Sequence, residues 1–152
     1  MPLQADIADA VVTGLNGHKF SQKFTAVRCY RPQARREDLG TLHVLVAPGP
    51  VSSGVATRGK NADRLAVEIG VLKAVATPDD LTALDGLAGL VEEIDLFLRR
   101  QNLTTVSRAT WESSETIDGA EAGFSKEFLD QQHVFLSVLR VTYLVFRRCT
   151  WG

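Results

Sequence analysis

Apolar residues recur every three or four positions in two parts of the chain, which is the spacing of an amphipathic helix. The first part, residues 7–15, predicts a short N-terminal helix that buries Ile7, Val11 and Leu15. The second, residues 77–100, predicts a long helix with Thr77 as its cap. Its apolar stripe consists of Leu81, Leu84, Leu87, Val91, Ile94 and Leu98.

Other segments are rich in β-branched and aromatic residues and indicate strands. Residues 24–32 and 41–48 predict a hairpin with a long polar turn. In residues 64–76 apolar side chains alternate onto one face, and a further strand is expected over residues 103–112. Residues 134–148 are apolar on both alternating faces, which favours a central strand covered on both sides.

The remaining segment, residues 112–130, carries six acidic residues against one lysine and two glycines. It predicts a loop that leads into a short helix at residues 125–131. The expected order is therefore helix, three strands, long helix, strand, short helix and strand. We predict an α+β fold in one domain, residues 1–152, with a single mostly antiparallel sheet packed against the long helix.

Composition narrows the classes of function. Apolar residues make up 45% of the 152 residues, as in ordinary globular proteins, and the formal net charge of −1 favours neither nucleic-acid nor membrane binding. The N-terminal residues lack the features of a signal peptide, and no window approaches the roughly 20 apolar residues of a membrane span. Two cysteines cannot form a disulfide framework. We expect a soluble protein with reduced thiols.

The stretch GVATRGKN, residues 54–61, matches the spacing of a phosphate-binding loop up to its last position, where Asn61 replaces serine or threonine. Such a loop needs a helix directly after Lys60, but the following residues alternate like a strand. We therefore expect no nucleotide site and no cofactor. Instead, residues 48–63 predict an unusually long loop between strands, and loops of that length are often functional.

We expect this loop to contact a protein partner, because its far end is locally basic. A solvated loop without a partner is the simpler alternative. The residues expected to make the contact are Ser52, Ser53, Arg58, Lys60, Asn61 and Asp63.

Other candidate sites have plainer interpretations. Cys29 and His43 face each other if the expected hairpin forms, and a thiol beside an imidazole can be a nucleophile, but no third orienting group is evident. No spacing of His, Cys and Asp resembles a metal site, so we predict no metal. Glu92, Glu93 and Asp95 fall off the apolar stripe and favour a solvated face, whereas Trp111 and Trp151 suit a core edge or an interface.

The whole layout resembles the tail-terminator, or tail-completion, family of long-tailed bacteriophages. The resemblance rests on the segments IADAVVTGL, FTAVRCYRP, TLHVLVAP, RLAVEIGVLKAV, LVEEIDLFLRR and FLSVLRVTYLVFRR, and it covers roughly the full chain. It implies a non-enzymatic virion protein that forms a hexameric ring, caps the tail tube and joins it to the head-tail connector protein. It also implies that DNA passes through the lumen without specific binding, and that the protein is in the host cytoplasm during assembly and in the virion neck afterwards.

Three alternatives stay open. A different neck or head-tail connector component is the nearest to a tail terminator. A small-molecule enzyme would use the Gly59–Lys60 loop, or Cys29 with His43. An interaction domain unrelated to phages is the third.

Overall fold

The computed structural model describes residues 3–30, 40–57, 60–100, 109–117 and 125–148. It has three helices and five strands, and the predicted α+β class with one mostly antiparallel sheet is confirmed. The elements are α1 (Leu3–Gly17), β1 (Ala26–Arg28), β2 (His43–Thr57), β3 (Lys60–Ala74), α2 (Leu81–Arg100), β4 (Thr110–Thr116), α3 (Lys126–Gln132) and β5 (Val134–Arg148).

The sheet has the order β1-β2-β3-β5-β4, and only the β1–β2 pair is parallel. The predicted hairpin between residues 24–32 and 41–48 is therefore wrong. The direction of β1 is set locally by Asn16 at the end of α1. Its amide oxygen accepts a hydrogen bond from the Ala26 N–H at 2.7 Å, and its amide nitrogen donates to the Ala26 carbonyl at 3.1 Å. This clamp ties the start of β1 to α1, and the chain then returns to form β2.

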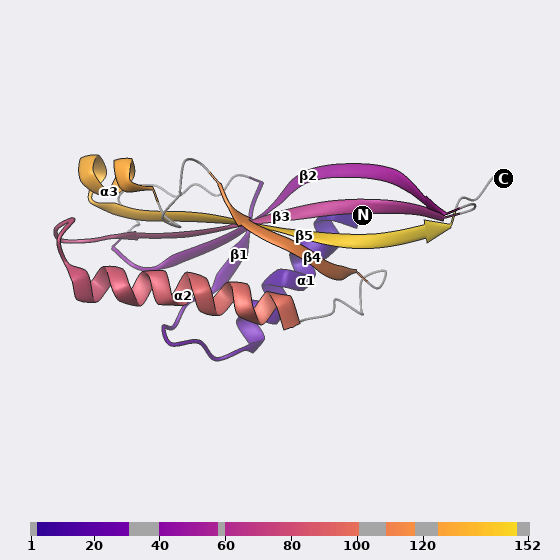
Figure 1. Ribbon diagram of the computed structural model, residues 1–152. Helices are drawn as coiled ribbons and strands as arrows, with labels where there is room; N and C mark the ends of the chain where they lie inside the picture. The colour runs from indigo at the N-terminus through magenta and orange to yellow at the C-terminus, as the bar shows by residue number, and fades with distance from the viewer. Residues whose placement is uncertain (1–2, 31–39, 58–59, 101–108, 118–124, 149–152) are drawn as a thin grey trace.

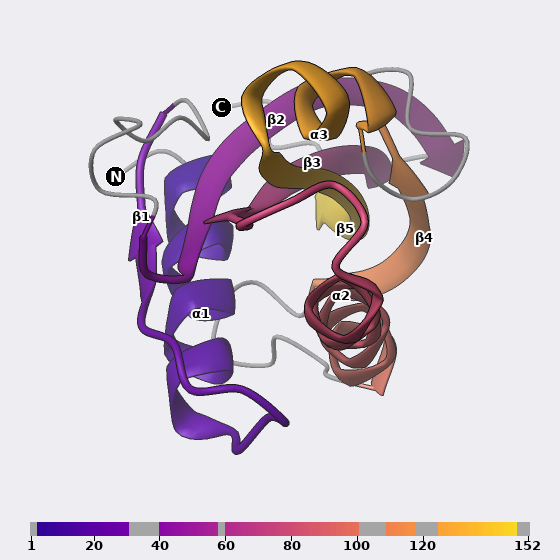
Figure 2. The same ribbon diagram turned by 90° about the vertical axis from the view of Figure 1, so that its left-hand side faces the viewer.

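Both α1 and α2 lie against one face of the curved sheet, which we call the helix face, whereas α3 lies on the other side (Figure 2). The predicted alternation in β3 is confirmed, because Leu65, Val67, Ile69 and Val71 all belong to the core on the helix face. β5 lies between β3 and β4, as its apolar pattern predicted. The core therefore fills the space between the two long central strands and the two longer helices.

The long helix starts later than predicted. It begins at Leu81, and Asp80 caps it by accepting a hydrogen bond from the Ala83 N–H at 3.2 Å. Thr77 instead closes the preceding turn, because its carbonyl accepts from the Asp80 N–H. As a result Leu81 lies outside the apolar stripe with 72% of its surface exposed, and Leu90, which the predicted stripe omitted, is fully buried.

This arrangement makes the helix cap testable. We expect Asp80→Ala to lower the free energy of unfolding by about 1 kcal/mol, because it removes the side-chain acceptor from the first turn. Thr77→Ala is the matched control and is expected to stay within about 0.5 kcal/mol of wild type, since it leaves the backbone carbonyl in place. Urea denaturation of both variants measures the difference. An equal loss in the two variants would contradict the assignment of Asp80 as the cap.

The acidic segment contains more structure than expected. Its predicted short helix is confirmed as α3, which ends at Gln132. The next residue, His133, is in the left-handed conformation with φ of 52°. Residues 112–116, predicted to be loop, instead complete β4. The strand that was predicted over residues 103–112 is therefore found nearer the C-terminus, at Thr110–Thr116. The part of this prediction before residue 109 lies outside the described residues. β4 is an edge strand, where polar side chains can face water and sequence alternation is weak.

Candidate assembly surface

The described part of residues 48–63 consists of two paired strands and not of the predicted long loop. β2 continues to Thr57, and β3 begins at Lys60. The two strands stay paired from His43↔Leu72 to Thr57↔Lys60, with irregularities between Pro48 and Val51 and between Val55 and Thr57. The polar sequence did not predict this part of β2, because its backbone pairs with β3 although its side chains show no alternation of buried and exposed positions.

β5 pairs with β3 along the same stretch, so three strands extend together beyond the helices (Figure 1). We call this extension the arm. It consists of Val51–Thr57 in β2, Lys60–Leu65 in β3 and Tyr143–Arg148 in β5. Seven strand residues at about 3.3 Å each give the β2 part of the arm a length of about 20 Å. At its base the arm is part of the core, because Leu65, Tyr143 and Val145 are buried on the helix side. Its opposite face and the exposed residues of β2 are the surfaces that it offers to a partner.

The predicted contact residues fall on different parts of the arm. Ser52 and Ser53 are exposed on β2, opposite Arg64 and Asp63. Asp63 is buried, with 9% of its surface exposed, so it is a poor contact residue in the isolated chain. Lys60 and Asn61 are the first residues of β3, opposite Thr57 and Val55, and Arg58 lies outside the described residues.

Two exposed apolar side chains on the arm were missed from the sequence. Val51 in β2 is 50% exposed, and Phe146 in β5 is 57% exposed. They lie on opposite faces, because Val51 pairs with the core residue Leu65 whereas Phe146 pairs with Ala62. In the sequence, Phe146 lies near the end of the long apolar strand at residues 134–148. This position was the available sign that Phe146 lies beyond the helices. Exposed aromatic and aliphatic residues of this kind are typical anchors of protein interfaces.

Over most of its length, the outer edge of β2 is not paired with any strand that the structure describes. β1 reaches β2 only at Val44–Val46, and Cys29 adds one hydrogen bond to the Val46 carbonyl. Among the described residues, no strand pairs with the edge from Val51 to Thr57. That stretch also carries no charged residue. Exposed edges are normally guarded by charges, prolines or bulges. Here Pro48 and Pro50 precede the stretch and an irregularity lies between Val55 and Thr57, whereas charges are absent from it.

The opposite edge of the sheet is acidic. β4 contains Glu112 and Glu115 and no lysine or arginine. Glu112 accepts a hydrogen bond from Arg64 Nε at 2.9 Å. Arg140 lies between Glu115 and Glu68, with nitrogen–oxygen distances of 3.4 Å and 3.3 Å. These ion pairs tie β4 to the two central strands, while both glutamates remain exposed.

Neither of the two candidate enzyme sites, the loop with Lys60 and the pair Cys29 and His43, has the geometry that its chemistry requires. Lys60 is followed by strand β3, as predicted, so the helix that a phosphate loop places after its lysine is replaced by sheet. Cys29 and His43 are not opposite each other. The parallel pairing of Arg28 with Val46 sets Cys29 about four residues, or about 13 Å, along the sheet from His43. Cys29 instead packs against Leu45 and Leu72.

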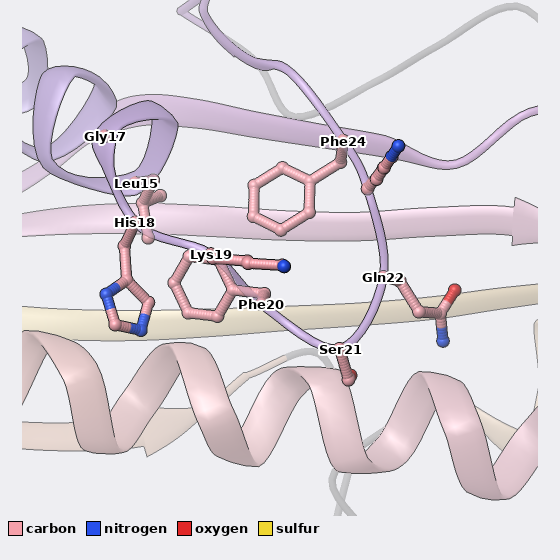
Figure 3. A pocket seen from close by; sticks show the side chains of 9 residues that line it. Leu15, Gly17, His18, Lys19, Phe20, Ser21, Gln22 and Phe24 are labelled. Carbon is pink, nitrogen blue, oxygen red and sulfur yellow. The ribbon is translucent and has the colours of Figure 1, made fainter.

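The connection between α1 and β1 forms an open hollow of about 600 Å³ beside α2 (Figure 3). His18 stacks on Phe97 of α2 with a ring distance of 4.5 Å, and Phe20 packs against both rings. The carboxylate of Glu93 accepts hydrogen bonds from the backbone and hydroxyl of Ser21. Glu93 thus fastens this connection to α2, whereas the sequence favoured a solvated position. The contacts around this hollow therefore hold the connection after α1 against α2.

The remaining candidates also have structural roles. Trp111 is half-buried at the core edge, donates a hydrogen bond to Ser114 and lies under the Arg99 guanidinium at 5.2 Å. Asp95 pairs with Arg99, and Glu92 is exposed. Trp151 lies outside the described residues. Within the described ranges, no three His, Cys, Asp and Glu side chains are grouped to hold a metal, and no helix is long and apolar enough to cross a membrane.

Comparison with protein-family models and with curated protein sequences finds no significant match for this chain.

Proposed function

We propose that the chain is a virion assembly protein that caps the tail tube of a long-tailed bacteriophage as an oligomeric ring. In this role it ends the polymerisation of tube subunits and joins the tube to the head-side connector. It acts by shape and surface contact, without catalysis. The observation that carries the proposal is the arm, because a three-stranded projection that exposes the apolar side chains Val51 and Phe146 is suited to protein assembly.

Two further features support this proposal. The arm exposes Val51 and Phe146 on opposite faces, so it can contact one protein on each side. The body is one sheet backed by two helices, and its helices and strands follow one another in the order expected from the sequence. In a ring, each subunit needs two different surfaces for its neighbours and further surfaces for the tube and the connector. The edges of the sheet and the faces of the arm supply such surfaces.

Tube capping can be measured directly. Tube subunits are polymerised with and without the purified chain, and tube length and tube ends are recorded by electron microscopy. We expect shorter tubes, each with a ring at one end. Light scattering measures the mass of the ring, expected to be about six times the 16.6 kDa of one chain.

A shortened arm provides the matched variant. Residues 54–62 are replaced by Asn-Gly, which joins the paired residues Ser53 and Asp63 through a two-residue hairpin turn. This variant keeps the helices and the body of the sheet, so its circular dichroism spectrum should match wild type. We expect it to fold and to leave tube growth unrestrained. Full capping by the shortened variant, or a wild-type chain that stays monomeric and never binds tube ends, would contradict the proposal.

A further inference from the structure

We infer that the hollow formed by the connection between α1 and β1 binds an acidic segment of a protein partner, with one apolar side chain inside it and carboxylates beside it. This inference goes beyond the proposed function and does not depend on it. The hollow, of about 600 Å³, is within the size range of binding sites. Because it is open to solvent, it would cover a small molecule on one side only, whereas a docked polypeptide segment also covers the opening.

The lining combines an apolar floor with cationic side chains. Leu15 is buried, with 1% of its surface exposed, and Phe20 and Phe24 are half-buried against the core. Figure 3 shows the Lys19 and Phe24 side chains pointing into the bend of the connection. Lys23 also lines the hollow, and none of its nine lining residues is acidic. This surface suits an apolar group that has negative charges next to it.

The two lysines have no acidic partner in the part of the chain that the structure describes. Lys19 and Lys23 are both exposed, and neither forms an ion pair with a described residue. Glu93 of α2 contacts the same connection, but its carboxylate accepts hydrogen bonds from the backbone and hydroxyl of Ser21. The lysines therefore remain available to the carboxylates of a partner. Exposed ion pairs contribute little each, so the apolar side chain has to supply part of the affinity.

The hollow has its shape before any partner binds. The Asn16 side chain fixes the connection to the start of β1. His18 is stacked on Phe97 with a ring distance of 4.5 Å, and Ser21 is hydrogen-bonded to Glu93. Because these contacts already order the connection, a partner does not have to order it on binding, and the entropic cost of association is lower.

A protein partner is favoured over nucleic acid because the aromatic rings are already packed. Phe20 lies edge-to-face against His18 at 4.7 Å and against Phe97 at 5.5 Å, and its ring is 5.3 Å from that of Phe24. Single-stranded nucleic acids bind through free ring faces on which bases stack, together with a positively charged groove along the backbone. Two lysines beside a packed cluster of rings do not supply these features.

A short acidic peptide tests the hollow. The probe is fluorescein-labelled Glu-Glu-Leu-Glu-Glu, and its binding to the full chain is followed by fluorescence anisotropy. We expect saturable binding with a Kd of about 1 mM or below. Lys19→Glu should weaken binding roughly tenfold, and Lys19→Arg, which keeps the charge, should leave it within about twofold. A peptide with alanine in place of leucine should bind roughly tenfold more weakly, because less apolar surface is buried.

Arg100→Glu is the matched control, because Arg100 is an exposed cation at the end of α2 and does not line the hollow. It is expected to leave binding within about twofold. Equal weakening by Lys19→Glu and Arg100→Glu would overturn the inference, since it would show a non-specific effect of charge. Circular dichroism checks that each variant is folded.

Three other results would also overturn the inference. The first is a wild-type chain that shows no saturable binding of the acidic peptide. The second is tighter, Lys19-dependent binding of an oligothymidylate, which would indicate a nucleic-acid site. The third is self-association that Lys19→Glu abolishes, which would make a second copy of the chain the occupant. Tube capping is measured separately, so failure of peptide binding leaves the proposed function standing.

Discussion

Leu90→Ala is expected to lower the free energy of unfolding by about 2–5 kcal/mol, the largest effect of a single substitution that we predict. Leu90 lies on the buried side of α2 and has no exposed surface, so truncation leaves a cavity between this helix and the sheet. Close packing limits how far the neighbouring side chains can fill such a cavity. Urea denaturation followed by circular dichroism measures the change.

Leu81→Ala is the matched control on the same helix. The sequence pattern placed Leu81 on the apolar stripe, but the structure leaves 72% of its surface exposed at the first position of α2. We therefore expect a change within about 0.5 kcal/mol. Equal losses for the two leucines would contradict the start of α2 at Leu81 and the orientation that follows from it.

Tyr143→Phe is expected to raise the free energy of unfolding by about 1 kcal/mol at neutral pH. Tyr143 is fully buried in the core, and its hydroxyl oxygen has no hydrogen-bond partner among the residues that the structure describes. A buried hydroxyl without a partner costs free energy, so removing it is favourable, in contrast to the usual loss when a bonded tyrosine is changed. Tyr30→Phe, at an exposed position, is the control and should have little effect. A clear loss on Tyr143→Phe would contradict the unpartnered hydroxyl.

The same tyrosine predicts loss of stability at alkaline pH. Burial raises the pKa of Tyr143 well above its ordinary value of 10.0, because the phenolate would be poorly solvated in the core. Below pH 10 the hydroxyl is protonated in both states. Above pH 10 the unfolded chain releases this proton while the folded chain retains it, so stability falls by about 1.4 kcal/mol per pH unit. We expect Tyr143→Phe to remove this part of the alkaline slope in denaturation curves.

The core elements were predictable from local pattern. β5 was located to the residue, and α1 and the buried face of β3 followed from the spacing of their apolar residues. These elements bury a regular set of side chains, and that burial is what the spacing records. Leu81 was assigned to the stripe because the cap was predicted at Thr77, whereas Asp80 caps the helix, and several residues in that turn are acceptable caps. Leu90 lies three residues after Leu87 and four before Ile94, so the buried face is wider than the predicted stripe.

The candidate assembly surface was only partly predictable. The segment containing Ser52 and Ser53 was singled out because it was long and lacked apolar periodicity, and the exposure of both serines agrees with a surface role. Its conformation was predicted wrongly, since a strand that is held by backbone hydrogen bonds needs no alternation in its side chains. Burial of Asp63 likewise depends on the packing of neighbouring elements.

By itself, the sequence determined the α+β class, the extent and central position of β5 and the buried face of β3, because each depends on the periodicity of a continuous segment. Only the tertiary structure decided the parallel placement of β1, the extension of β2 and β3 into the arm, and the two open edges of the sheet. Those features depend on which strands become neighbours in space. Such pairing is made by backbone groups that every residue carries, so the identities of the side chains hold little record of it.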